Sequence, residues 1–303
     1  MTKLLERRDF LKAGVVTATT LAGSSAWAIQ RPEEKKRRFL KTLKFGMVEE
    51  DLSIADKFRL LKDLGYDGVE MDSPTDLDLN EVLRARDAVD FPIPSLIDSV
   101  HWRKTLSDPD PKVREEGLEG LCTALRDAKT LGASSVLLVP AVVKEDVPYD
   151  VAYYRSQAEI RRAIPLAEAL GVRIALENVW NQFLYSPLEM ARYIDEFESP
   201  WVGAHFDIGN VVNFGWPEHW IRVLGPRIFK LDIKEYSREK RDKEGPFAGF
   251  RVKLGDGSIN WPSVVDALEQ IGYEGWVSAE VDGGDRTWLE ELSQRMDRVL
   301  GLA

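Results

Sequence analysis

Four acidic residues each stand at the end of a short segment in which apolar and polar residues alternate. These residues are Glu177, Asp207, Asp232 and Glu280. Successive side chains of a β-strand point to opposite faces, so each segment, taken as a strand, directs its carboxylate to its polar face. Converging carboxylates repel one another unless a cation or protons bind among them. The pattern therefore predicts a divalent-metal site with these four residues as ligands.

The composition supports a globular domain and excludes several kinds of site. The chain has 303 residues, of which 44% are hydrophobic, enough for a full core. Its formal net charge is -10 and its pI about 5.1. Nucleic-acid binding requires a basic surface, so no nucleic-acid partner is expected. The one cysteine, Cys122, excludes an intrachain disulfide and a thiolate metal cage.

The amino terminus resembles a bacterial Tat export signal. A twin arginine, Arg7-Arg8, precedes a mildly apolar run at 13–22 and an Ala-Trp-Ala sequence at 26–28, a small-x-small cleavage pattern. The alternative is an amphipathic first helix, but the run is rich in Thr, Gly and Ser and is poor helix core. The run is also too short to cross a bilayer permanently, so no stable membrane span is expected after cleavage.

This resemblance defines the expected domain organisation. Residues 1–28 are expected to be the Tat signal, cleaved after Ala28, and residues 29–40 a charged tether before the folded domain at 41–303. The Tat translocase is then a partner during export, and the mature protein is periplasmic or extracellular. Because Tat moves folded proteins, a metal ion could be loaded before export.

From residue 42 onward, strand-like segments alternate with amphipathic helical segments. The expected strands span 43–48, 68–72, 94–100, 135–141, 172–178, 201–207, 228–235 and 276–281. The expected helices span 54–64, 79–88, 111–131, 150–170, 187–197, 217–224, 261–271 and 286–300. Eight strand–helix units predict a (β/α)8 TIM barrel of the α/β class. An open doubly wound sheet is the alternative, but it usually has a Gly-rich phosphate turn after its first strand, where this chain reads Met-Val-Glu-Glu at 47–50.

In such a barrel the chemistry gathers at the carboxyl ends of the strands. The four acidic residues fall there, together with Glu70 and Asp72 after the second strand. The longest connection, 236–260, is rich in charge and glycine, and a loop of this length is typical of a lid or substrate clamp.

Three motifs give the chain a resemblance to a known superfamily. They are Ile-Ala-Leu-Glu-Asn at 174–178, His-Phe-Asp-Ile-Gly-Asn at 205–210 and Gly-Asp-Gly-Ser-Ile-Asn-Trp at 255–261. From about residue 41 to its end, the chain resembles the xylose isomerase-like TIM barrel superfamily. Within it, the chain is most similar to the sugar phosphate isomerase/epimerase group, which also resembles AP endonuclease family 2.

The resemblance implies one divalent cation held by a Glu, an Asp, a His and a Glu from four strands. Glu177, Asp207 and Glu280 match this motif, but Asp232 stands where the family has a histidine. An all-oxygen site favours Mn²⁺ or Mg²⁺ over Zn²⁺. The alternative is that Asp232 pairs with a neighbouring lysine and leaves three ligands.

The resemblance also implies the chemistry. In the family's ketose epimerases the cation binds adjacent oxygens of a hydroxy-carbonyl sugar and lowers the cost of an enediolate. One carboxylate takes the proton from carbon and another returns it. By resemblance, Glu177 and Glu280 are the catalytic pair, whereas the plainer alternative gives them metal ligation alone.

Six further residues are expected to contact substrate. They are His205, His101, Lys230, Arg238, Trp180 and Asn210. His205 lies on the inward face of its strand, with core filling as the alternative. Arg238 matches a place where relatives contact substrate oxygens, but it is also compatible with a solvated loop charge. His101 follows the third strand, where a helix-cap role is the alternative to lining the pocket.

The remaining substrate residues lie on strands and loops at the same end. Lys230 and Lys234 point inward and could offset the acidic cluster or bind an anionic intermediate. Trp180 lies in a loop at the active end, as do Phe183 and Trp216, where aromatic rings stack on sugar faces. Asn210 is the last residue of the His-Phe-Asp-Ile-Gly-Asn motif.

These features predict a divalent-metal-dependent sugar isomerase or epimerase that acts through an enediolate. They are compatible with assembly into an oligomer. An exported location and an acidic site disfavour a sugar phosphate and favour a free or keto sugar, or a glycoside. Two alternatives are a metal-dependent lyase or hydratase on 3-keto-glycosides and a non-catalytic exported sugar-binding protein. DNA repair is disfavoured by the acidic charge and by only three histidines, too few for a trinuclear zinc site.

Overall fold

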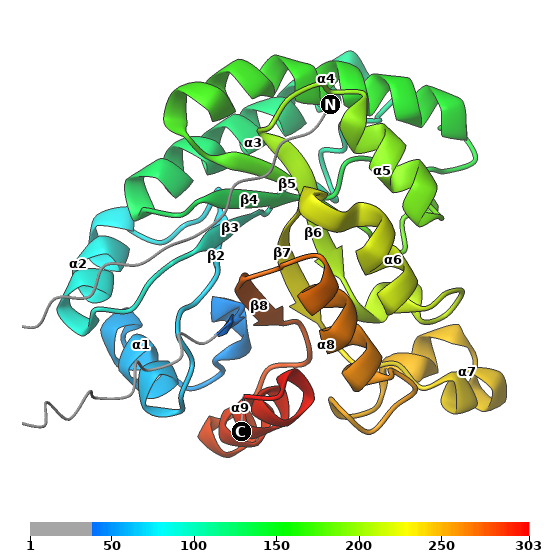
Figure 1. Cartoon of the computed structure of the whole chain (residues 1–303). Coiled ribbons are helices and arrows are strands. Elements are labelled where there is room, and N and C mark those ends of the chain that lie inside the picture. Colours follow the sequence, from blue (N-terminus) through cyan, green and yellow to red (C-terminus); the bar gives the residue numbers. More distant parts are fainter. Residues whose placement is uncertain (1–37, 303) are drawn as a thin grey trace, which may run out of the picture. The chain divides into compact units, whose positions relative to one another are not determined.

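Eight short strands form the centre of the fold, and each is followed by a helix (Figure 1). The computed structural model describes residues 38–302. The strands are β1 (Phe39–Leu43), β2 (Met71–Ser73), β3 (Ser95–Asp98), β4 (Ser135–Leu138), β5 (Arg173–Glu177), β6 (Val202–Asp207), β7 (Ile228–Ile233) and β8 (Gly275–Ala279). They pair in parallel in the order β1-β8-β7-β6-β5-β4-β3-β2.

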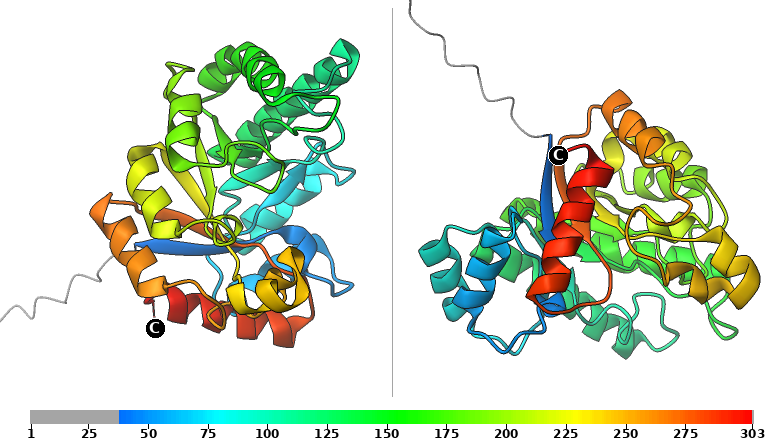
Figure 2. Two further views of the ribbon diagram at one scale, coloured as in Figure 1. Left: turned by 90° about the vertical axis from the view of Figure 1, so that its right-hand side faces the viewer. Right: turned by 90° about the horizontal axis from the view of Figure 1, so that it is seen from below.

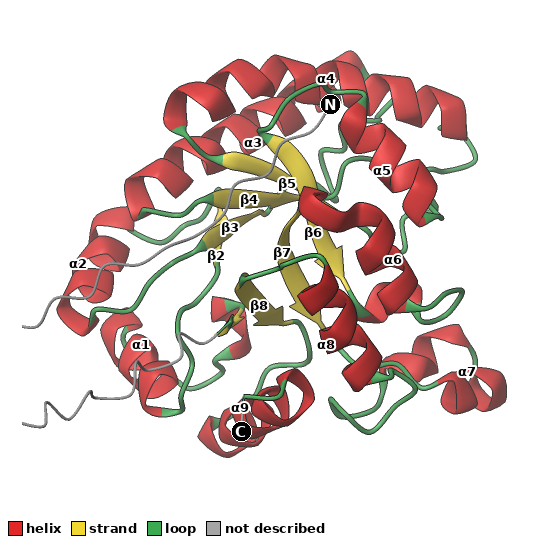
Figure 3. Cartoon of the chain, viewed as in Figure 1, coloured by secondary structure: helices red, strands yellow, loops and turns green. Residues whose placement is uncertain are grey.

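The sheet closes on itself between β1 and β2. Lys44 and Glu70 form a parallel bridge there. The Glu70 N–H donates to the Leu43 carbonyl at 2.9 Å, and the Phe45 N–H donates to the Glu70 carbonyl at 2.8 Å. The predicted (β/α)8 TIM barrel is therefore confirmed, with strands inside and helices outside (Figure 3).

The predicted helices are present in the described part of the chain, with one addition, α7. They are α1 (Ile54–Asp63), α2 (Leu79–Val89), α3 (Pro111–Leu131), α4 (Tyr149–Leu170), α5 (Pro187–Asp195), α6 (Pro217–Leu224), α7 (Arg238–Glu244), α8 (Trp261–Gln270) and α9 (Arg286–Leu300). α3 shows why these segments are helical. Asp110 caps its start by accepting from the Lys112 N–H at 2.8 Å, and Pro111 takes the first position. The helix ends at Gly132, whose φ of 78° is left-handed and favours glycine.

β1 lies at Phe39–Leu43, so the predicted strand at 43–48 was wrong. The reason is Lys41, whose buried ammonium pairs with Asp297 Oδ1 at 2.7 Å and donates to Ser293 Oγ at 2.8 Å. Both partners belong to α9, which lies alongside β1 (Figure 2). A buried lysine breaks the apolar pattern by which a strand is recognised.

The expected Tat signal at 1–28 and residues 29–37 of the expected tether lie outside the described residues. Residues 39–40, also expected in the tether, belong to β1. Within residues 38–302, no helix has the length and apolar character needed to cross a membrane.

The connection between β7 and α8 was predicted as one long loop at 236–260. It contains α7 and the 3-10 turn η4 (Pro246–Phe250). α7 reads Arg-Glu-Lys-Arg-Asp-Lys-Glu and has no buried residue, so it has no apolar period by which it could be recognised.

Glu235 fastens the second half of this connection to the barrel. Its buried carboxylate accepts from the Gly255 N–H at 2.8 Å and from Trp261 Nε1 at 3.0 Å. A Cβ at Gly257 would lie 2.4 Å from Glu235 Oε1, so the chain can wrap this closely only with glycine there. The Gly-Asp-Gly-Ser-Ile-Asn-Trp motif is therefore explained as a loop wound around one carboxylate.

Candidate active site

The structure brings the four predicted acidic side chains together at the carboxyl ends of four adjacent strands. Glu177 ends β5, Asp207 ends β6, Asp232 lies one residue before the end of β7, and Glu280 directly follows β8. Each offers a carboxylate oxygen, and these four oxygens all lie within 4.8 Å of one another. Such proximity is tolerated only if protons or positive charges lie among them.

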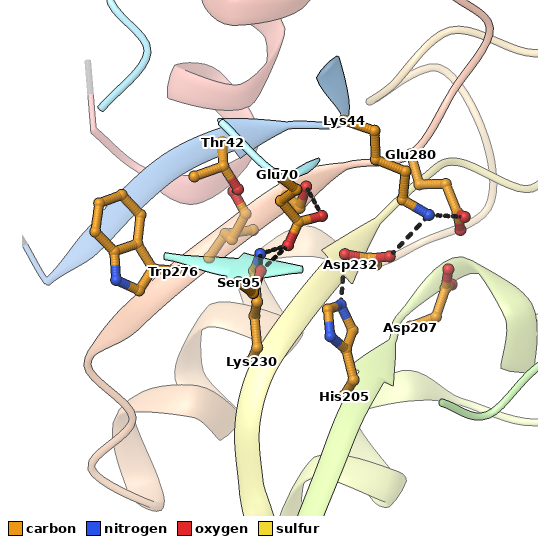
Figure 4. Close-up of polar contacts among 12 residues, drawn as sticks. Thr42, Lys44, Glu70, Ser95, His205, Asp207, Lys230, Asp232, Trp276 and Glu280 are labelled. Atoms are coloured by element: carbon orange, nitrogen blue, oxygen red, sulfur yellow. Dashed lines mark hydrogen bonds and ion pairs between the residues drawn. The ribbon is translucent and has the colours of Figure 1, made fainter. Parts of the chain in front are cut away.

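Two lysines, Lys44 and Lys234, supply part of that charge, and Figure 4 shows Lys44 beside Glu280 and Asp232. The Lys44 ammonium contacts the Glu280 carboxylate and lies 3.5 Å from Asp232 Oδ2. The Lys234 ammonium also contacts Glu280 and lies 3.0 Å from Asp207 Oδ2. Four ionised carboxylates and two ammonium groups leave a formal charge of -2, which is the charge that one divalent cation balances.

The surroundings shift the pKa values of Glu177, Asp207 and Glu280 in different directions. Burial, and then the charge of Glu280, raise the pKa of Glu177 to about 8. Burial also raises the pKa of Asp207 to about 7, despite the opposing Lys234. Burial acts on Glu280 in the same direction, but Lys234 and Lys44 outweigh it and hold the pKa of Glu280 well below its usual value.

Each aspartate uses one oxygen within the protein and leaves the other without a hydrogen bond. Asp207 Oδ1 accepts from the Asn210 N–H at 2.7 Å, and Asp232 Oδ1 lies 2.7 Å from His205 Nε2. Among the described residues, Asp207 Oδ2 and Asp232 Oδ2 are buried and accept no hydrogen bond of normal geometry, and their polar contacts are with the ammonium groups of Lys234 at 3.0 Å and Lys44 at 3.5 Å. Buried polar atoms are normally satisfied, so two such oxygens in one cluster fit a cation-binding site.

His205 lies behind Asp232 and not on the cleft wall. Its ring is fully buried, and its Nε2 faces Asp232. Burial would lower the pKa of His205, but Asp232 outweighs it and raises that pKa. The contact of His205 with substrate stays a prediction. In this structure its ring is as fully buried as Asp207 and Asp232, and it fixes the orientation of Asp232.

Lys230 also lies deeper in the barrel than predicted. Its ammonium pairs with Glu70 and donates to Ser95 Oγ (Figure 4). Ser278 Oγ donates to the other Glu70 oxygen at 2.9 Å. Burial lowers the pKa of Lys230 to about 7. The contact of Lys230 with substrate stays a prediction, and in this structure its ammonium is bound within this buried network.

Asn178 and Asn210 hold the loops after β5 and β6 in place. The Asp207 N–H donates to Asn178 Oδ1 at 2.8 Å, and Asn178 Nδ2 donates to the Asp207 carbonyl at 2.8 Å. Asn210 Nδ2 donates to the Asn178 carbonyl at 3.0 Å, and Trp180 Nε1 donates to the Asn210 carbonyl at 2.8 Å. This explains why the motifs that contain Glu177 and Asp207 both end in asparagine.

A cleft of about 720 Å³ opens beside the carboxylates. Trp180, Asn210, Lys234 and Glu280 line it, together with residues 250–254. Two of the predicted substrate residues, Trp180 and Asn210, therefore lie on its wall.

The other two predicted substrate residues lie elsewhere. His101 is buried, accepts from the Val139 N–H at Nδ1 (3.2 Å), and has a pKa lowered to about 3 by burial and then by Lys44. Arg238 donates to the Val212 carbonyl at 3.1 Å and the Gly215 carbonyl at 2.6 Å. It therefore ties α7 to the loop after β6, and neither residue lines the cleft.

The sequence did not reveal the roles of Lys44 or of Gly209, the glycine that leaves room for the Lys234 side chain. Lys44 follows β1 directly, so a correct placement of that strand would have put a charged side chain at the carboxyl end of the barrel. A Cβ at Gly209 would lie 2.3 Å from Lys234 Cγ and 2.7 Å from the Lys234 carbonyl oxygen. Gly209 therefore leaves the space through which Lys234 reaches the carboxylates.

Comparison with known proteins identifies the chain's relatives. A sequence profile described as xylose isomerase-like TIM barrel matches residues 58–298. The chain is 27% identical over 271 residues to the putative L-ribulose-5-phosphate 3-epimerase SgbU of Escherichia coli strain K12, covering 82% of this chain and 89% of that protein.

Two solved structures share the fold. The apo form of 3-keto-D-glucoside 4-epimerase YcjR from E. coli has a TM-score of 0.71 at 16% identity, covering 87% of this chain and 99% of that one. D-allulose 3-epimerase from Methylomonas sp. in complex with D-allulose has a TM-score of 0.70 at 20% identity, covering 86% and 96%. All three proteins are sugar epimerases by name.

Replacing Lys230 with Met tests whether this lysine is structural. Loss of the ammonium leaves Glu70 buried without a partner, so we expect K230M to lower the free energy of unfolding by about 3–5 kcal/mol. The double variant E70Q/K230M should recover much of that loss in denaturant unfolding. The control K243M, on the exposed face of α7, should change stability by less than about 0.5 kcal/mol. Native stability in K230M together with lost sugar binding would instead favour the substrate role.

Proposed function

Because the chain belongs to the xylose isomerase-like TIM barrel family, we propose that it is a divalent-metal-dependent sugar epimerase or isomerase. Its substrate carries a hydroxyl group and a carbonyl group on adjacent carbons. The observation that carries this proposal is the pair of buried aspartate oxygens, Asp207 Oδ2 and Asp232 Oδ2, which face lysine ammonium groups but accept no hydrogen bond of normal geometry in the described chain. They lie in a cluster whose formal charge falls short of neutrality by two.

Glu177, Asp207, Asp232 and Glu280 would hold the cation. A donor set of carboxylate oxygens is hard, and therefore favours Mn²⁺ or Mg²⁺. When bound, the cation would polarise the substrate carbonyl as a Lewis acid and so lower the cost of an enediolate.

Glu177 and Glu280 are the proposed acid–base pair. In the strand order, β7 and β6 with their aspartates stand between β8 and β5, so the two glutamates flank the centre from its two sides. A substrate bound between them presents opposite faces of one carbon to the two carboxylates. One can then remove a proton from one face while the other delivers a proton to the opposite face, which inverts the carbon.

A neutral sugar fits this centre better than a sugar phosphate. A divalent cation would bring the formal charge of the four acids and two lysines to zero, leaving no excess positive charge at the carboxylates themselves. Of the two other cations that line the cleft, Lys253 is paired with Glu291 at 2.8 Å and Arg251 is exposed. A lyase or hydratase acting on 3-keto-glycosides would use the same carboxylates, and release of the aglycone distinguishes that reaction from epimerisation.

Export by the Tat route is part of the proposal, on the strength of Arg7-Arg8 and the Ala-Trp-Ala sequence at 26–28. We expect the mature protein, sequenced from its amino terminus in cells that export it, to begin at Ile29. An intact amino terminus on the cell-associated protein would contradict export.

Asp232→Asn tests the ligand that departs from the family pattern. Losing one anionic oxygen should weaken Mn²⁺ binding by at least about tenfold, as measured by calorimetry and by elemental analysis after reconstitution. The matched control is D282N, because Asp282 is exposed, lines the same cleft and lies outside the cluster. Equal affinities in D232N and in the unmodified protein would remove Asp232 from the ligand set.

Glu177→Gln and Glu280→Gln test the acid–base pair. Each change keeps the shape of the side chain and removes its ability to exchange a proton. Turnover of a ketose or of methyl 3-keto-glucoside in deuterated buffer, followed by carbon-bound deuterium and a new epimer, should fall by about 10²–10⁴-fold in each variant. The exposed control E274Q should retain activity. Full activity in either active-site variant would exclude that residue from proton transfer.

A further inference from the structure

A second cavity of about 280 Å³ adjoins the catalytic cleft. The two cavities share three lining residues, Trp180, Asn210 and Phe247. The rings of Trp180 and Phe247 lie 5.2 Å apart and form the boundary between them. A substrate seated at the carboxylates can therefore extend past these rings into the second cavity.

The two cavities differ in charge. Lys234, Glu280 and Asp282 are among the charged residues that line the catalytic cleft. None of the residues lining the second cavity is Asp, Glu, Lys, Arg or His. Nothing in it would attract or neutralise a charged group, so the moiety it accepts is neutral.

Aromatic side chains dominate the second cavity and remain exposed around it. Tyr185 comes from the loop after β5 and Phe214 from the loop after β6, and their rings lie 6.3 Å apart. Tyr185 is 53% exposed, Phe214 48% and Phe247 70%. Three large exposed aromatic side chains around one cavity are unusual for a solvent-facing surface and indicate a ligand that covers them.

The wall of the second cavity is held in a fixed shape. Gln182 and Leu184 both adopt a left-handed backbone, with φ of 60° and 56°, which is costly for residues other than glycine. Hydrogen bonds hold this loop: the Leu184 N–H donates to the Tyr149 hydroxyl at 2.9 Å, and Asn181 Nδ2 donates to the Ala141 carbonyl at 2.7 Å. Such fixed strain next to a cleft is typical of a preformed binding surface.

Three of the four side-chain amides in the wall are hydrogen-bonded within the described part of the chain; the Gln182 amide and the Tyr185 hydroxyl are not. The side-chain amides of Asn178 and Asn210 donate to backbone carbonyls, and Asn213 Oδ1 accepts from the Tyr236 hydroxyl at 3.1 Å. A second sugar ring, with several hydroxyl groups to satisfy, fits such a wall less well than a flat apolar ring, which binds through its faces.

We propose that the second cavity binds the neutral, apolar aglycone of a glycoside whose sugar ring occupies the carboxylate centre. The inference rests on the proposed function, since it places the sugar there, and it narrows the substrate class. In a glycoside the anomeric carbon is blocked, so the adjacent hydroxyl and carbonyl groups lie on other ring carbons. The substrate is then a keto-glycoside and not an open-chain ketose.

Binding of phenyl and methyl β-glucosides to the full, metal-reconstituted chain tests the cavity. These compounds lack the carbonyl and are not turned over, so calorimetry gives their dissociation constants directly. The phenyl compound should bind about 3- to 10-fold more tightly than the methyl compound. Y185A and F214A should each reduce this preference while leaving the methyl compound unaffected. The control Y154A, whose side chain is 69% exposed on α4 and lines neither cavity, should keep the preference.

Equal binding of the phenyl and methyl compounds, or equal weakening of both in Y185A and F214A, would overturn the proposal. Unfolding curves that match the parent protein exclude misfolding, and F214L provides a second, milder variant. Turnover of methyl 3-keto-glucoside measures the proposed function separately. A phenyl preference without any turnover would leave the cavity assigned and reject the proposed function, whereas turnover without a phenyl preference would reject the cavity alone.

Discussion

Repulsion among four buried carboxylates is the constraint around which the rest of this protein is organised. In a medium of low dielectric, like charges a few ångströms apart are costly, and the cost rises as water is excluded. Lys44 and Lys234 offset half of the formal charge, and both contact Glu280. The other half of the negative charge must be offset by protons or by a bound cation. The Asp207 and Asp232 oxygens that accept no hydrogen bond indicate where a cation would be held.

The barrel meets this constraint by arranging polar groups in two layers. Inside the barrel, Glu70 and Lys230 neutralise each other, and the Ser95 and Ser278 hydroxyl groups each donate to one of the two Glu70 oxygens. At the carboxyl ends of the strands, the acidic cluster borders the cleft through Glu280, while Glu177, Asp207 and Asp232 are buried. His205 joins the layers, because it is buried at the depth of the first and orients Asp232 in the second.

The barrel and the family were predicted from the sequence, and both are confirmed. The alternation of apolar and polar residues shows which side chains face inward, and the last residues of each strand show which side chains lie at the carboxyl end of the barrel. The sequence also placed the four acids at one end. The sequence did not show how deep in the barrel an inward-facing side chain lies. Lys230 points inward as predicted, but only the structure shows that its ammonium pairs with Glu70. The buried Lys41 interrupts the apolar pattern of β1, so this strand was predicted too late in the sequence. Lys44 was therefore not recognised as a residue at the carboxyl end of the barrel. The short helix α7 was missed because it buries no side chain and therefore has no apolar period.

A crystal structure of the protein soaked with Mn²⁺, with the ion located by its anomalous scattering, tests the central claim most directly. The account predicts one strong peak among the carboxylates of Glu177, Asp207, Asp232 and Glu280, with the previously unbonded aspartate oxygens turned toward it. A crystal that shows no peak there, with the ammonium groups of the two lysines still filling the centre, would contradict it.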